Sequence, residues 1–331
     1  MKDSSQMDAP SQMEKIPLLV IAGPTAVGKT DCAISIALHL PFPGEIISAD
    51  SMQVYKYLNL GTAKPSLEQQ LAVKHHLIDL VTPDQEFTVS DFRRLFDKTI
   101  TEVISRGKLP ILSGGTGLYI RASLQAYLGD NPAGADWDLR LRLQEAAREQ
   151  GAEFLFEQLK IVDPVAAARI HPNDLRRVIR ALEVYQTTGR PISSLQSKQP
   201  AEELYQLTYI FLERERADLY HRIDQRVDCM IEQGLLDEVR SLLEMGYSSD
   251  LKPMQGLGYR QMNDYLQKKC SWEEAVAAMK QQTRNYAKRQ LTWFRKEPID
   301  FRMNLTNRGP EFLGEILEYL EGRFDQMSNN I

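Results

Sequence analysis

The chain is poor in the residues that cross-link small extracellular folds or build structural metal sites. Its 331 residues include three cysteines, Cys32, Cys229 and Cys270, which lie far apart and form no C-x-x-C pair. Its five histidines show no H-x-x-x-H spacing, which would place two metal ligands on one face of a helix. We therefore expect neither a disulfide framework nor a structural zinc site.

Long hydrophobic runs are also absent. No apolar run approaches the roughly twenty residues that span a bilayer, and residues 1–15 lack the apolar stretch of a secretory signal. The composition, 43% hydrophobic and 26% charged, is typical of a soluble globular protein. We expect a cytoplasmic protein without membrane association, with loose tails at residues 1–15 and 323–331. The net charge of −5 argues weakly against a uniformly basic nucleic-acid binder, so local patches decide that question.

A glycine-rich turn is the clearest motif that is present. Residues 18–22 predict a buried strand and residues 31–40 a helix, and the segment between them fits G-x-x-x-x-G-K-[ST] without a mismatch. In such a loop backbone N–H groups surround a phosphate, Lys29 supplies a positive charge and the Thr30 hydroxyl can ligate Mg²⁺. The loop predicts binding of a di- or triphosphate by Gly23, Pro24, Thr25, Ala26, Val27, Gly28, Lys29 and Thr30.

Two further segments are expected to end at the same edge of a parallel sheet. Residues 45–50 form a short apolar run that ends in Asp50, and ligands collect beyond the carboxyl ends of parallel strands. Asp50 is therefore a candidate acid or base, or else a helix cap or turn residue. Residues 109–113 predict another strand, and the glycine-rich turn after it can bring Thr116 to the first loop. A tight turn that merely needs glycine is the alternative.

The strand at 109–113 ends in serine and glycine, not in the acidic residue that holds Mg²⁺ in motor-type nucleotide hydrolases. Residues 77–81 predict a further strand, in which Asp79 could take that role. The case for ATP hydrolysis is nevertheless thin. Residues 90–105 predict an amphipathic helix with Ser90 as its cap.

Residues 124–200 carry few strand signals and predict a helical insertion domain within an α/β core made of residues 16–123 and 201–322. Helices are expected at 138–150 and 174–187, and residues 207–212 predict the return to the sheet. Three arginines of the second helix, Arg176, Arg177 and Arg180, cluster on overlapping faces. A solvated basic face and a phosphate-binding face are both compatible with this pattern.

Residues 219–236 predict a helix on which Arg222 and Arg226 lie one turn apart. The neighbouring Asp218, Asp224 and Asp228 could simply pair with these arginines.

Residues 280–296 contain several basic residues interleaved with aromatic ones and no acidic residue. Within an acidic protein this balance favours contact with nucleic acid or a leaving polyphosphate over an ordinary basic helix.

Together these motifs resemble one family, the tRNA dimethylallyltransferases, which modify adenosine beside the anticodon. The matching stretches are GPTAVGKT at 23–30, ISADSMQVYKYLNLGTAKP at 47–65, GGTGLY at 114–119, DPVAAARIHPND at 163–174, GLGYRQM at 256–262 and TRNYAKRQLTWFR at 283–295. They occur in the family's order and span nearly the whole chain. The resemblance implies a P-loop NTPase-like parallel sheet flanked by helices, with an all-helical insertion domain.

The resemblance also implies the chemistry. The first loop would hold dimethylallyl diphosphate rather than ATP, and the dimethylallyl group would pass to N6 of the adenosine at position 37 of tRNA, with release of diphosphate. Asp50 matches the family's proposed general base and Thr116 a residue that contacts the leaving group. Arg226, with Arg222 beside it, matches the diphosphate clamp; these residues and Lys29 are the expected catalytic set. Mg²⁺ on Thr30 is the expected cofactor, and a monomer is expected.

The resemblance further implies that the adenine is flipped out of the anticodon loop and reaches the donor through a channel, while the insertion domain embraces the anticodon stem. The residues expected against the anticodon stem-loop are Asp50, Ser51, Met52, Gln53, Thr116, Arg140, Arg176, Arg177, Arg180, Gln255, Gly256, Leu257, Gly258, Tyr259, Arg260, Arg284 and Lys288.

Three other functions remain open on the residues alone. An adenylate isopentenyltransferase, which prenylates free AMP, ADP or ATP, would share the donor loop and Asp50 but would not need the basic insertion and C-terminal helix. A small-molecule P-loop kinase and a non-catalytic nucleotide-dependent RNA-binding switch explain the motif series less well.

Overall fold

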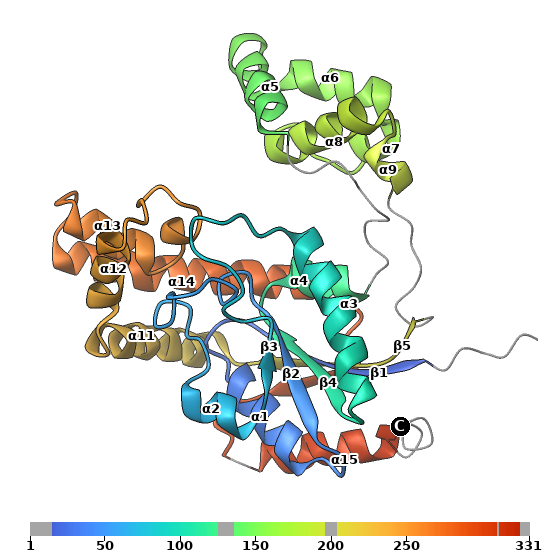
Figure 1. Ribbon diagram of the computed structural model, residues 1–331, viewed down its shortest axis with the longest axis vertical. Coiled ribbons are helices and arrows are strands. Elements are labelled where there is room, and N and C mark those ends of the chain that lie inside the picture. Colours follow the sequence, from blue (N-terminus) through green and yellow to red (C-terminus); the bar gives the residue numbers. More distant parts are fainter. Residues whose placement is uncertain (1–14, 125–135, 196–203, 310, 325–331) are drawn as a thin grey trace, which may run out of the picture. The chain divides into compact units, whose positions relative to one another are not determined.

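The computed structural model describes residues 15–124, 136–195, 204–309 and 311–324 (Figure 1). The chain divides into two compact units: a core unit, Met1–Ser123 with Ala201–Ile331, and an insertion unit, Leu124–Pro200. The predicted tails at 1–15 and 323–331 lie almost entirely outside the described residues.

A six-stranded sheet with the order β3-β2-β4-β1-β5-β6 forms the centre of the core unit. Every neighbouring pair of strands is parallel. The central strands are buried on both faces, as expected for apolar runs in a parallel sheet covered by helices. The predicted α/β architecture is thereby confirmed. The strands are β1 Ile16–Ala22, β2 Gly44–Ala49, β3 His75–His76, β4 Leu109–Gly114, β5 Tyr205–Glu213 and β6 Phe301–Asn304.

Helices cover both faces of this sheet (Figure 1). Helices α1 (Lys29–His39) and α15 (Phe312–Phe324) share one apolar core with alternate residues of β1, β4 and β5. Helix α3 (Val89–Ser105) packs on the opposite face, where its Phe96 meets the ring of Tyr205. The sheet edge that bears the carboxyl ends of β1, β2 and β4 is thus held between two helical layers.

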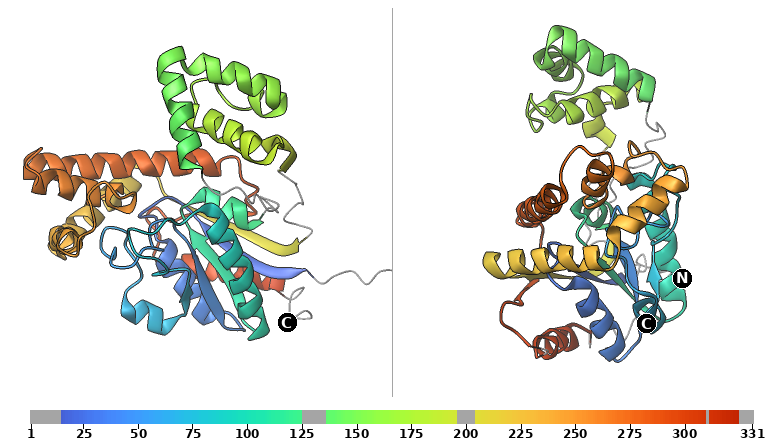
Figure 2. Two further views of the ribbon diagram at one scale, coloured as in Figure 1. Left: turned by 45° about the horizontal axis from the view of Figure 1, so that its top comes forward. Right: turned by 90° about the vertical axis from the view of Figure 1, so that its left-hand side faces the viewer.

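The long helix α14 (Trp272–Phe294) packs on α11 (Arg216–Glu232) and α13 (Tyr259–Leu266) (Figure 2). Residues 280–294 of the predicted basic segment form the C-terminal part of this helix, and Arg295 and Lys296 follow its end. The helix begins at the Ser271 cap with Glu273 and Glu274 in its first turn. Acidic residues at that end complement the helix dipole. The other helices described in the core unit are α2 Leu67–Ala72, α4 Gly117–Leu124, α11 Arg216–Glu232, α12 Leu235–Glu244 and α13 Tyr259–Leu266, with a short 3₁₀ turn at Pro253–Gln255.

All regular elements described in the insertion unit are helices: α5 Trp137–Gln150, α6 Ala152–Val162, α7 Pro164–Ala167, α8 Leu175–Thr188 and α9 Ile192–Leu195. They enclose a separate apolar core. Buried Asp163 joins two of its segments, because its carboxylate accepts hydrogen bonds from the N–H of Ala166 and from the N–H and hydroxyl of Ser193.

The predicted strand at 77–81 is wrong. Strand β3 ends at His76, and Leu77 and Asp79 have φ angles of 61° and 53°, which no strand tolerates. The N–H groups of Leu80 and Val81 donate instead to the carbonyl oxygen of Val54, in the segment that follows β2.

Two helix boundaries also differ from prediction. Thr88, not Ser90, caps α3, because Asp91 stands at the position from which its carboxylate can return a hydrogen bond to the cap N–H. The helix predicted at 219–236 is two helices, since Gly234 adopts a φ of 97° between α11 and α12.

Candidate active site

The loop at residues 23–30 connects β1 to α1. Positively charged side chains donate hydrogen bonds to several of its backbone carbonyl oxygens. Pro24, Ala26 and Val27 accept hydrogen bonds from Lys29 Nζ (2.8 Å), Arg222 Nε (3.1 Å) and Arg214 Nε (3.0 Å), respectively. These hydrogen bonds compensate the partial negative charge of the three carbonyl oxygens, which would otherwise repel an anion at the loop. Gly28, with a φ of 111°, makes the left-handed turn into the first residue of α1.

A cavity of about 500 Å³ opens beside this loop. It is bounded by the N-terminus of α1, by one side of α11 and by residues of the segment that follows β2. Its lining includes Gly28, Lys29, Thr30, Asn59, Leu60, Lys64, Arg222, Gln225, Arg226 and Cys229. The loop, Lys29, Thr30 and both arginines of α11 therefore meet at one cavity.

Two of these cations, Lys29 and Arg226, form no ion pair with a described residue. Burial, reinforced by the positive charge of Arg226, lowers the pKa of Lys29 to about 7, although Asp50 acts in the opposite direction. Burial likewise lowers the pKa of Arg226. Within the described parts of the chain, Arg226 has no hydrogen bond or ion pair. Desolvated cations of this kind can be stabilised by an anion from solution, so the lining of this cavity favours an anionic ligand.

The aspartates near Arg222 and Arg226 do not neutralise them. Asp218 pairs with Arg214 (2.8 Å), Asp224 with Arg284 (2.6 Å) and Asp228 with Lys280 (2.6 Å). The alternative in which these three carboxylates pair with the two arginines is therefore wrong, although Asp50 and Asp31 still attract the charge of Arg226.

Asp50 directly follows β2 and uses one oxygen to close a turn. Its Oδ1 accepts the N–H of Met52 at 2.8 Å and, more weakly, that of Gln53 at 3.4 Å. No hydrogen bond to Oδ2 is formed by any described residue. Asp50 is thus a turn residue through one oxygen, and its second oxygen is available to accept a proton.

The second glycine-rich turn lies against the end of β2. The N–H of Thr116 donates to the carbonyl of Ala49 (3.1 Å), and Thr116 Oγ1 accepts the N–H of Ser51 (3.1 Å). Only glycine fits at Gly114, because a Cβ there would lie 2.2 Å from the Ala49 carbonyl oxygen. The structure therefore brings Thr116 next to the residue that follows Asp50.

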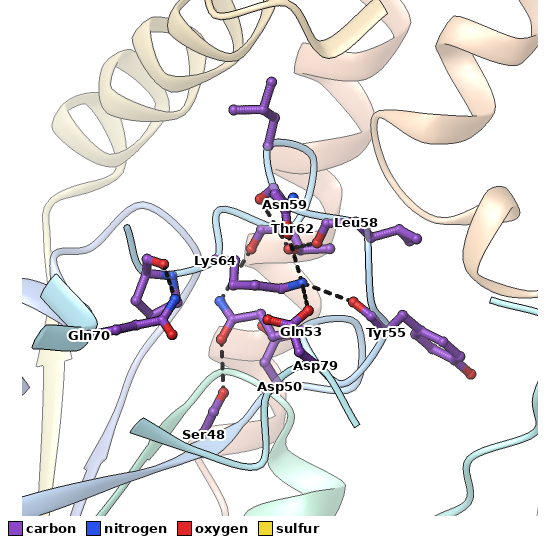
Figure 3. Close-up of polar contacts among 12 residues, drawn as sticks. Ser48, Asp50, Gln53, Tyr55, Leu58, Asn59, Thr62, Lys64, Gln70 and Asp79 are labelled. Carbon is purple, nitrogen blue, oxygen red and sulfur yellow. Dashed lines mark hydrogen bonds and ion pairs between the residues drawn. The ribbon is translucent and has the colours of Figure 1, made fainter. Parts of the chain in front are cut away.

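A polar network holds the segment after Asp50 in place (Figure 3). The Gln53 side chain accepts the Ser48 hydroxyl (2.8 Å) and donates to the carbonyls of Thr62 (3.3 Å) and Ala63 (3.2 Å). Because both ends of this buried amide are occupied, the RNA contact expected from Gln53 is not available to its side chain.

Lys64 is the second centre of that network (Figure 3). Its ammonium group donates to the Tyr55 carbonyl and the Asn59 amide oxygen, both at 2.9 Å, and pairs with Asp79 at 2.5 Å. Asp79 thus helps to hold this segment and is not among the residues that line the cavity, so a role as the metal-binding acid of an ATPase is not supported.

Residues of the turn at 255–260 divide into exposed and buried ones. Gln255 and Arg260 are exposed, whereas Tyr259 is fully buried and its hydroxyl donates to Glu238 Oε1 at 2.6 Å. Glu238 also accepts the N–H of Leu60 at 2.9 Å. The Tyr259 ring therefore anchors the turn to α12 and the cavity wall, and RNA contacts of its side chain are not supported.

The arginines expected to meet RNA in the insertion unit are partly engaged. Arg140 and Arg180 both bind Glu183, which is fully buried, at 2.9 and 2.7 Å. Arg176 and Arg177 are exposed on α8. Their contacts with RNA stay predictions.

Several supporting residues escaped prediction. Arg214, Lys64 and Glu238 hold the donor loop or the segment after Asp50, and Gln290 on α14 contacts the loop as well. No local pattern marks them, since each partner lies far away in sequence or is a backbone group.

Comparison with known proteins points to one family. A family model described as IPP transferase matches residues 53–297. The chain is 48% identical over 312 residues to the tRNA dimethylallyltransferase of Alkaliphilus oremlandii, covering 94% of this chain and 99% of that protein. It is 50% identical over 297 residues to the tRNA dimethylallyltransferase of Symbiobacterium thermophilum, covering 90% and 91%.

Solved structures agree. A full-length tRNA isopentenylpyrophosphate transferase from Bacillus halodurans superposes with a TM-score of 0.70 at 42% identity, covering 95% of this chain and 99% of that one. A eukaryotic dimethylallyltransferase acting on tRNA superposes with a TM-score of 0.80 at 29% identity, covering 96% and 81%.

Proposed function

The chain belongs to the IPP transferase family, and from this membership we propose that it transfers a dimethylallyl group from dimethylallyl diphosphate to N6 of the adenosine at position 37 of tRNA. One structural observation carries the donor side of this proposal. Arg226 and Lys29 line a single cavity with the glycine loop, and Arg226 has no partner among the residues described.

The reaction breaks the bond between the allylic carbon and the diphosphate oxygen and forms a bond from that carbon to N6. Because an allylic cation is delocalised, the chief task of the protein is to stabilise the departing diphosphate. Lys29, Arg222 and Arg226 line the cavity, and their positive charges can stabilise it. A bound diphosphate raises the pKa of Lys29 and keeps it protonated.

Thr30 fits a magnesium ion carried by the diphosphate. Its hydroxyl belongs to a residue that lines the cavity, and no described residue hydrogen-bonds to it. The described residues contain no cluster of three or more His, Cys, Asp or Glu side chains suited to a metal. Mg²⁺ commonly keeps several waters and binds through substrate phosphates with few protein ligands, so the Thr30 hydroxyl can be one of its ligands. When bound, the ion would neutralise part of the charge that develops on the leaving group.

Asp50 is the proposed general base. The amino group of adenine is a weak nucleophile, and it loses a proton as the new carbon–nitrogen bond forms. Since Oδ1 is held by the N–H of Met52, the carboxylate is oriented and Oδ2 can take that proton.

The relatives named for tRNA favour RNA over free nucleotide as the acceptor. No observation favours transfer to AMP, ADP or ATP, and none favours a kinase or a nucleotide switch.

In the described residues no helix is both long and apolar enough to cross a membrane. The cytoplasmic location and the monomeric state stay predictions of the sequence.

A direct assay tests the proposed function. The purified protein is incubated with Mg²⁺ and radiolabelled dimethylallyl diphosphate, together with unmodified tRNA or, separately, AMP or ATP. We expect label in tRNA alone. Label in the free nucleotide would assign the chain to the alternative activity, and no transfer to any acceptor would contradict the proposal.

The outer face of α14 is proposed to contact the RNA backbone, and its two basic residues should contribute unequally. Lys288 is exposed and has no ion pair with a described residue, whereas Arg284 is bound to Asp224. A plot of log affinity for tRNA against log salt concentration has a negative slope, and Lys288→Gln should make that slope less steep by about 0.7. Arg284→Gln should change it less. An unchanged slope for Lys288→Gln would mean that this face does not bind phosphate.

A further inference from the structure

A single buried amide joins the two glycine-rich turns of the active site. Gln290 lies on the inner face of α14 and is 5% exposed. Its Oε1 accepts the N–H of Thr25 in the donor loop at 2.8 Å, and its Nε2 donates to the carbonyl of Gly115 at 3.0 Å. The register of β1 with β4 places Ala22 opposite Gly114, and the Gln290 amide joins the two turns beyond these strand ends.

The connection continues to the acceptor side. Gly115 precedes Thr116, whose hydroxyl accepts the N–H of Ser51, the residue after Asp50. One helical turn before Gln290, the Tyr286 hydroxyl shares hydrogen bonds with Thr116 and Gln290. Burial raises the pKa of Tyr286 to about 12, so this phenol stays neutral at physiological pH.

We propose that Gln290 is a positioning residue that sets the spacing between the donor loop and the turn that supports Asp50. The inference rests on the proposed function, because it assumes that a donor on the first loop reacts near Asp50. It assigns to α14 a role in the reaction, in addition to the RNA contact proposed for its outer face.

The chemistry of the side chain supports this role. An amide is the neutral side chain that donates and accepts at once, and both bonds here are made to backbone groups that do not titrate. An apolar replacement would leave the Gly115 carbonyl and the Thr25 N–H without their partner in a buried place, which favours movement of the turns.

Glycine at position 115 provides the space for this amide. A Cβ at Gly115 would lie 2.3 Å from Gln290 Nε2, while its next contact, the Gly23 carbonyl oxygen, is at 3.5 Å. Because the end of a flexible side chain is what must give way, Gly115→Ala should displace the amide and leave the backbone in place. Its effect on the reaction should therefore resemble that of replacing Gln290.

The first test compares Gln290→Met and Gln290→Glu with wild type in the tRNA assay. Misplacement of reacting groups by about 1 Å costs on the order of 100-fold in rate, so kcat for Gln290→Met should fall by roughly 10- to 100-fold, with tRNA affinity retained. An ionised glutamate accepts from Thr25 but repels the Gly115 carbonyl, whereas a protonated one restores both bonds. The activity of Gln290→Glu relative to wild type should therefore rise as the pH falls, and that of Gln290→Met should not.

Two controls separate positioning from a general effect of the substitutions. Gln85→Met and Gln85→Glu make the same changes at an exposed glutamine before α3, which belongs neither to the cavity lining nor to the residues expected against RNA, and should leave kcat unchanged. Gly115→Ala should slow the wild type but cost nothing further in the Gln290→Met background, because the amide it displaces is already gone.

The outcomes are distinct. An inactive wild type would overturn the proposed function itself. An active wild type together with a folded Gln290→Met variant of equal kcat would overturn the positioning role. Additive effects of Gly115→Ala and Gln290→Met on kcat would also overturn it. Identical pH profiles for Gln290→Met and Gln290→Glu would do the same.

Discussion

Asp50→Asn should lower kcat for prenyl transfer to tRNA by about 10²- to 10⁴-fold, the range that general-base catalysis contributes. The asparagine side-chain oxygen can still accept the N–H of Met52, which Asp50 Oδ1 now holds at 2.8 Å. The turn after β2 is therefore preserved, while the group that takes the proton from N6 is lost. Single-turnover rates with saturating donor and tRNA measure this effect directly.

The comparison with Asp50→Ala separates the two tasks of the residue. Alanine removes the turn contact as well as the base, so it should additionally weaken the binding of tRNA to the segment after Asp50. If Asp50→Asn retained the full rate, Asp50 would be only a turn residue, and its proposed chemical role would be lost.

The parts of the site that could be predicted depend on residues that are close to one another in the sequence. The strand, loop and helix around Lys29 follow from one apolar run and one motif, and the carboxyl-edge rule places Asp50 beside it. The register of β2 with β4, in which Ala49 lies opposite Gly114, then brings Thr116 to the same edge. These contacts need only the order of elements in a parallel sheet.

Pairings between distant side chains could not be predicted in this way. The sequence places Asp224 two residues from Arg222 and from Arg226, yet its partner is Arg284, on another helix. Helix periodicity gives the neighbours on one helix, but the choice among partners depends on how α11 and α14 pack. The free charge of Arg226 appears only once that packing is known.

In two places the local backbone conformation or a capping hydrogen bond decided the structure against the prediction from the sequence pattern. The apolar run at 77–81 looks like a strand, but left-handed residues at Leu77 and Asp79 turn it toward the segment after β2. Both Thr88 and Ser90 can cap a helix, and Thr88 prevails because Asp91 lies three residues after it. The residue three after Ser90 is Arg93, which cannot return that bond.

Lys29→Met should reduce kcat by about 10²- to 10³-fold, as loss of one preorganised donor to a developing anion does. It should also remove a pH dependence of donor binding. Burial holds the pKa of Lys29 near 7 in the free protein, and a bound diphosphate raises it. Above that pH, binding requires uptake of a proton, so the affinity of the wild type for dimethylallyl diphosphate should fall by up to about tenfold per pH unit.

Titration calorimetry with the donor, below and above neutral pH, tests this linkage. Protonation of the diphosphate itself affects wild type and Lys29→Met alike, so the difference between the two belongs to Lys29. Arg226→Gln provides the second control, because the positive charge of Arg226 helps to lower the pKa of Lys29. Its removal should move the loss of affinity to higher pH. Parallel pH profiles for wild type and Lys29→Met would show that Lys29 does not change its protonation on binding, which would contradict this prediction.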